Sequence, residues 1–138
     1  MRLKSDKLLS KLEERSHSSA EAEMLNLANN ELDTEEIVKA LSLFPGLTGY
    51  CLAKNEITSL AEIAKRLKNT RVRSLALGGN PLNTGAVLSF GGVVKYLDIK
   101  QLGLAGLMLG DIRAKHFIEN IKDANLSSLD LSYNNISN

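Results

Sequence analysis

The chain has 138 residues, a length that one domain with a continuous core can account for. Apolar residues make up 43% of the sequence and aromatic residues only 4%, so the core must be mostly aliphatic. The net charge of +1 excludes a protein that is drawn to nucleic acid or anionic lipid by its overall field. The single cysteine, Cys51, excludes an internal disulfide framework and is typical of a reducing compartment.

The N-terminal segment, residues 5–16, has the apolar spacing of an amphipathic helix. Ser5 stands at the N-cap position, and the apolar face is formed by Leu8, Leu9 and Leu12. We expect residues 1–21 to form a capping helix with its linker, since the first unit of a repeat array needs such a cover. The alternative is a helix that binds a partner. No segment has the apolar run of a signal peptide or a membrane span, so we expect a cytoplasmic protein.

Residues 22–138 contain a repeated pattern, Leu-x-Leu-x-x-Asn-x-Leu. Copies begin at Leu25, Tyr50, Leu75 and Leu129, and a weaker copy, LDIKQLGL, begins at Leu97. The second apolar position then falls at Leu27, Leu52, Leu77, Ile99 and Leu131, in steps of 25, 25, 22 and 32 residues. The pattern predicts an array of about five units, with a modified fourth unit and an incomplete last one.

Each unit begins with the alternation of a strand, because alternate side chains of an extended segment share one face. An asparagine follows three residues after the second leucine, where the strand turns into a loop. A buried amide at this place can satisfy backbone groups of a neighbouring loop. The pattern therefore predicts a ladder of structural asparagines, with a break in the fourth unit where Leu102 replaces the amide: Asn30, Asn55, Asn80 and Asn134.

Between the strands the apolar spacing becomes helical. It predicts helices over residues 34–44, 58–68 and 112–123, capped by Thr34, Thr58 and Asp111. In the last helix we expect a buried face of Ile112, Phe117, Ile121 and Ala114. The third connection, TGAVLSFGGV, is rich in glycine and predicts only a turn or two of helix.

These repeats, each followed by a helix, resemble leucine-rich repeat proteins, and most closely the ribonuclease-inhibitor-like class. The resemblance implies a right-handed α/β solenoid, a horseshoe segment with a parallel sheet on the concave face and helices on the convex face. It also implies a non-enzymatic scaffold that binds another protein, without cofactor or metal. The texture of SLDLSYNNI is similar to repeat proteins of intracellular bacteria, which would imply delivery of an effector into a host cell.

In this family the concave face usually binds the ligand. Its polar and aromatic residues gather toward the C-terminal end of the chain, and tyrosine is favoured at interface hot spots. The candidate partner-binding residues are therefore Tyr96, Asp98, Lys100, Gln101, Asp130 and Tyr133. The alternative is a solvated sheet face on which these residues have no role.

A second candidate is the apolar segment QLGLAGLMLGD, residues 101–111. Leu107, Met108 and Leu109 are more apolar than a surface loop normally is. They either fill the core beneath a longer unit or form a protein-binding loop.

Catalysis finds little support in the sequence. His17 and His116 are far apart, neither has a nucleophile or a paired carboxylate beside it, and Cys51 adds no zinc-ligand spacing. A GTPase-regulating leucine-rich repeat protein is the alternative function, although no residue matches the catalytic positions of that type closely enough to be transferred.

The sequence stops inside a unit, since no helix follows Asn134 and Ile136. Three interpretations remain open. The chain is a fragment of a longer array, or a homodimer or self-associating array joined through the open edge of its last strand, or its last residues fray.

Overall fold

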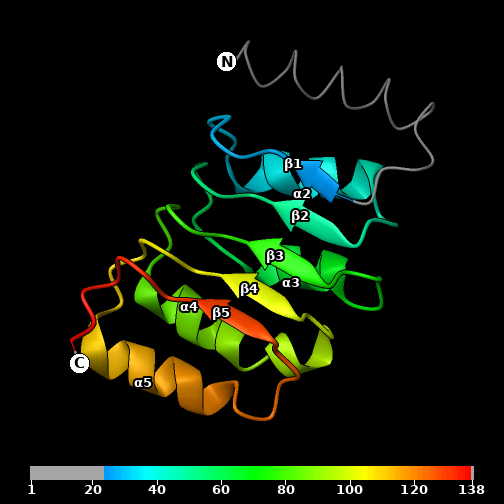
Figure 1. Cartoon of the computed structure of the whole chain (residues 1–138). Coiled ribbons are helices and arrows are strands. Elements are labelled where there is room, and N and C mark those ends of the chain that lie inside the picture. Colours follow the sequence, from blue (N-terminus) through cyan, green and yellow to red (C-terminus); the bar gives the residue numbers. More distant parts are fainter. Residues whose placement is uncertain (1–23, 138) are drawn as a thin grey trace.

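The computed structural model describes residues 24–137, and the expected capping helix lies outside this range. The chain forms an α/β fold around one parallel sheet of five strands in chain order, β1-β2-β3-β4-β5 (Figure 1). The strands have three residues each: β1 Met24–Asn26, β2 Gly49–Cys51, β3 Ser74–Ala76, β4 Gln101–Gly103 and β5 Ser128–Asp130. Parallel neighbours require a crossover connection, and each crossover here contains a helix.

The helices of the described chain lie on one side of the sheet (Figure 1). They are α2 Thr34–Leu43, α3 Ala61–Leu67, α4 Thr84–Gly91 and α5 Gly110–Asn120, and a short 3-10 helix, η1 Val94–Tyr96, follows α4. The glycine-rich third connection is thus more helical than the sequence indicated. Its eight-residue α4 is capped by Asn83, whose side chain accepts a hydrogen bond from the Ala86 amide.

The fourth strand corrects the predicted register. Leu75 pairs with Leu102, so β4 begins at Gln101 and not at Leu97. The equivalent strand positions are then Leu25, Tyr50, Leu75, Leu102 and Leu129, spaced by 25, 25, 27 and 27 residues. Leu97 and Ile99 imitated a strand because they alternate and are both buried, but they pack in the segment before β4. The spacing is more regular than predicted.

The start of α2 also differs from the prediction. Asp33, not Thr34, is the N-cap: its carboxylate accepts from the Glu36 amide, and the Glu36 carboxylate accepts from the Asp33 amide, both at 2.9 Å. Thr34 is the first helical residue, and its hydroxyl accepts a hydrogen bond from the Thr58 amide at 3.0 Å. Thr58 does not cap α3, because that helix begins only at Ala61.

In α5 the predicted cap and one core residue were wrong. Leu109 is the N-cap residue, and Asp111 lies inside the first turn. Ile112 is 76% exposed, whereas Phe117 is fully buried, because the buried residues of this segment are spaced three and four apart and Ile112, two residues before Ala114, lies on the opposite side of the helix. Ala114 and Ile121 are buried as expected.

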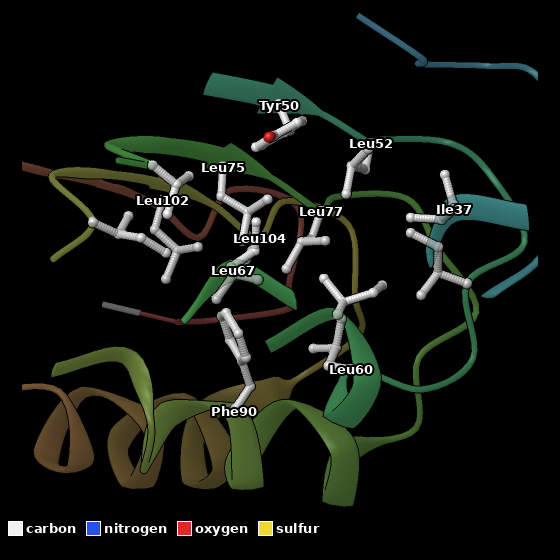
Figure 2. Packing of buried hydrophobic residues seen from close by; sticks show 14 of the residues in the cluster. Ile37, Tyr50, Leu52, Leu60, Leu67, Leu75, Leu77, Phe90, Leu102 and Leu104 are labelled. Atoms are coloured by element: carbon white, nitrogen blue, oxygen red, sulfur yellow. The ribbon is translucent and has the colours of Figure 1, made fainter. Parts of the chain in front are cut away.

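The core lies between the sheet and the helices. Figure 2 shows Phe90 pointing from the helical layer toward the strand leucines, among them Leu75, Leu77, Leu102 and Leu104. Leu27, Leu52 and Leu77 each follow their strand and are almost completely buried. An aliphatic stack of this kind is stabilised by the area that each leucine removes from water.

Tyr50 is the aromatic exception in this stack. It occupies the place that leucine has in the neighbouring strands, and its hydroxyl donates to the Phe44 carbonyl (Figure 2). Burial raises the pKa of Tyr50 above its ordinary value, although a hydrogen bond with the Leu47 backbone opposes part of this shift. The neutral phenol is therefore the form that the fold retains.

Alkaline pH should destabilise the protein through Tyr50. Because the folded pKa is the higher one, the contribution of the neutral phenol is complete below about pH 10 and is lost as the pH rises through the folded pKa. In a Tyr96→Phe/Tyr133→Phe variant, the phenolate absorbance of Tyr50 should titrate above that of free tyrosine. The Tyr50→Phe variant should lack this alkaline loss of stability. A midpoint equal to that of free tyrosine would contradict the burial of Tyr50.

Candidate functional site

One face of the sheet carries no helix in the described chain (Figure 1). The central residue of each strand points into the core, and the flanking residues point to the opposite face. We call the latter surface the open face; its residues are Met24, Asn26, Gly49, Cys51, Ser74, Ala76, Gln101, Gly103, Ser128 and Asp130. Its middle consists of small side chains, so another molecule can approach the backbone closely there.

Asparagine side chains hold the loops that follow the strands. Asn55 Oδ1 accepts from the amides of Asn30 (3.1 Å) and Leu32 (3.0 Å) in the preceding unit. Asn55 Nδ2 donates to the carbonyls of Leu27 (2.9 Å), Leu52 (3.2 Å) and Ala53 (3.2 Å). Asn55 is buried, so these bonds satisfy groups that water does not reach.

The same arrangement recurs along the sheet. Asn80 Oδ1 accepts from the amides of Asn55 and Ile57, and Asn134 Oδ1 accepts from those of Leu107 and Leu109. Asn30 differs, because its side chain donates only to the carbonyls of Leu27 and Ala28 among the described residues.

The fourth unit interrupts the series, but at Leu107 and not at Leu102. Leu107 stands three residues after Leu104, where Asn80 stands three residues after Leu77. The Leu82 amide donates instead to the Asn80 carbonyl at 2.8 Å, within its own loop. No asparagine side chain therefore links the third unit to the fourth, whereas Asn80 links the second unit to the third and Asn134 links the fourth to the fifth.

Charged residues cluster before β4. Asp98 lies 3.0 Å from Arg73 and 3.5 Å from Lys100, joining the segments that precede two neighbouring strands. These side chains are between one third and three fifths exposed, so the pairs orient the segment more than they stabilise it.

Gln101 and Asp130 lie on neighbouring strands of the open face, where Gly103 pairs with Asp130. The Asp130 carboxylate accepts from the Ser132 hydroxyl (2.6 Å) and amide (2.9 Å). These hydrogen bonds hold the pKa of Asp130 below its usual range. Asp130 is thus a fixed anion on the open face.

The two candidate tyrosines lie in different places. Tyr133 follows β5 and is 88% exposed, near Asp130 in the sequence. Tyr96 belongs to η1, before β4, and lines a groove between α3 and α4. The expectation that Tyr96 lies on the concave strand face was therefore wrong, and the cause is the misplaced register of the fourth unit.

The apolar segment at 101–111 divides between core and surface. Leu107 and Leu109 are 5% and 1% exposed, whereas Met108 between them is 73% exposed. The two leucines fill the core, and their amides are held by Asn134. Of the three apolar residues 107–109, only Met108 remains available to another molecule.

The potential metal ligands in residues 24–137 do not gather into a site. No group of three or more His, Cys, Asp or Glu side chains in this range could hold a metal ion. His116 is exposed on α5, and Cys51 is half-buried on the open face. Between residues 24 and 137, the helices are too short and too polar to cross a membrane.

No protein-family model matches the chain, and no curated protein matches its sequence.

Proposed function

We propose that the chain is a non-enzymatic scaffold that binds another protein through the open face. The observation that carries the proposal is a five-stranded parallel sheet whose outward residues no described element covers. Parallel sheets are normally covered on both faces, so a face of this kind is available for a partner.

The proposal includes the leucine-rich repeat class and a right-handed solenoid. It is supported by strands spaced 25, 25, 27 and 27 residues apart, the first four of which are each followed by a helix. The hydrogen bonds of Asn55, Asn80 and Asn134, which link successive loops, support it as well.

The contact would centre on the C-terminal half of the open face. Gln101 and Asp130 supply polar groups there, and Tyr133 supplies an exposed aromatic ring at the edge. A tyrosine beside a fixed carboxylate has the composition of an interface hot spot surrounded by polar rim residues. The small residues of β3 let a partner lie close to the sheet.

An affinity selection from a displayed protein library would test the proposal. Binders selected on the wild-type chain should lose binding to Ala76→Arg and to Asp130→Ala/Tyr133→Ala. Ala76 is on the central strand and Tyr133 is exposed, so both variants should stay folded. A cooperative thermal unfolding transition would verify this.

Arg113→Ala is the matched control, since Arg113 is an exposed residue of α5 outside the open face. Binders that lose affinity for Arg113→Ala as strongly as for Ala76→Arg would speak against the open face. Binders that keep full affinity for every open-face variant would also speak against the open face as the contact surface. Tyr96→Ala is measured separately, because Tyr96 lies beside the helices and not on the open face.

A further inference from the structure

The helical side of the molecule contains a groove that is separate from the open face. It has a volume of about 610 Å³ and lies between α3 and α4. Its floor is apolar, formed by Leu60, Phe90 and Leu97, each less than 5% exposed. Figure 2 shows Leu60 and Phe90 close to the helical layer that borders this region.

The two walls of the groove are helix faces made of small residues. Ala61 and Ala64 of α3 lie three residues apart, and Ala86 and Ser89 of α4 repeat this spacing. Residues three or four apart share one side of a helix. Side chains this short leave room for another helix to approach both backbones, as ridges pack into grooves between neighbouring helices.

The charge of the groove has one sign. Among its lining residues, all within the described chain, the charged ones are Lys65 on α3 and Lys68 at its C-cap, and both are exposed. Glu62 lies 3.6 Å from Lys65 but does not line the groove. A third cation, Lys95, lies 5.3 Å from the ring of Tyr96 at the other end of the groove. Cations on the rim select an occupant with acidic groups.

We propose that this groove binds an amphipathic helix of a partner protein, with apolar residues on one face and Asp or Glu residues beside them. The apolar face would lie above the floor of the groove and cover the exposed Val93 and Tyr96, and the acidic residues would meet Lys65 and Lys68. This mode of recognition, a helix laid into an apolar groove, requires no rearrangement of the sheet. It adds a second contact surface, on the helical side, that is independent of the open face.

A designed peptide tests the proposal without knowledge of the natural partner. The probe is a fluorescein-labelled amphipathic helix with leucines on one face and glutamates on its flanks, and its control carries lysines in place of the glutamates. Fluorescence anisotropy should show binding of the glutamate peptide only, and the binding should weaken with salt. Amide shifts in nuclear magnetic resonance spectra should map to Ala64, Ala86 and Ser89.

Two variants locate the contact. Lys65→Glu/Lys68→Glu should weaken the glutamate peptide by about tenfold and improve the lysine peptide. Lys39→Glu/Lys122→Glu changes two exposed lysines outside the groove and should have little effect. Ser89→Trp fills the groove from α4 and should abolish binding, whereas Ser89→Ala should not. Thermal unfolding of each variant separates lost binding from lost folding.

Other outcomes would overturn the proposal. Equal binding of both peptides, or shifts outside the groove, would exclude an acidic helix. Binding of dodecanoate without binding of the peptide would assign the groove to a small acidic amphiphile. A dimer in analytical ultracentrifugation that Ser89→Trp dissociates would assign the groove to a second copy of the chain. None of these results depends on the open-face variants.

Discussion

Asn55→Ala should lower the free energy of unfolding by about 3–5 kcal/mol, a large effect for a single polar residue. The substitution removes the acceptor of the Asn30 and Leu32 amides, and Leu32 is fully buried. It also removes the donor to the carbonyls of Leu27 and Leu52. Each buried group left without a partner costs about 1–3 kcal/mol. Urea denaturation followed by circular dichroism measures the effect.

Asn30→Ala is the matched control for this prediction. The Asn30 side chain is half-buried and donates only to carbonyls of its own loop within residues 24–137. Its loss should cost about 1 kcal/mol. If Asn30→Ala and Asn55→Ala had equal effects, the hydrogen bonds between units would not be the source of the stability.

Leu107→Ser/Leu109→Ser should destabilise the protein by about 5 kcal/mol or more, since truncation of one buried leucine already costs about 2–5 kcal/mol. Both side chains lie in the core, and serine leaves a cavity with a hydroxyl that must find a partner. Differential scanning calorimetry should show a large fall of the melting temperature or no transition at all. The single Leu109→Ala variant keeps the effect measurable if the double variant does not fold.

Met108→Ser is the control from the same segment. Because Met108 is 73% exposed, its replacement should change the free energy of unfolding by less than about 0.5 kcal/mol. A melting temperature that is unchanged in Leu107→Ser/Leu109→Ser would restore the interpretation of this segment as a contact loop. A large loss in Met108→Ser would show that the exposed methionine is part of the packing.

The strands, the asparagine positions and the place of the helices on one side of the sheet could be predicted, because each unit repeats the same pattern at nearly constant spacing. Leu27, Leu52 and Leu77 occupy equivalent positions, so one pattern defines three strands at once. The hydrogen bonds of Asn55 follow from the same repetition, since a polar residue at a fixed place between buried leucines needs partners.

The register of the fourth unit could not be predicted from local pattern. Leu97 and Ile99 have the alternating spacing of strand residues and are as buried as the leucines of the strands. Only the pairing with Leu75 identifies Leu102 as the equivalent residue. The error moved Tyr96 to the wrong surface. It also hid the asparagine position at Leu107.

The groove between α3 and α4 was not predicted either, for a different reason. Its width depends on how far apart two helices lie, and the end of α3 at Leu67 is 17 positions before the start of α4 at Thr84. Small residues such as Ala64 and Ser89 indicate where helices can approach closely, but not whether a neighbour fills the space. A search for matching small-residue faces on consecutive helices is the signal that would have suggested it.

Leu107 in place of an asparagine has a mechanical consequence. Side-chain amides link the first three strands, and Asn134 links the last two. The junction between β3 and β4 has no such amide and relies on backbone pairing, aliphatic contact and the partly exposed Arg73–Asp98 ion pair. Bending and local opening should therefore concentrate between β3 and β4. Hydrogen–deuterium exchange should begin there before it begins in the units on either side. A partner that contacts both ends of the sheet would bend the protein between β3 and β4. The curvature of the sheet would then adjust to the shape of the partner.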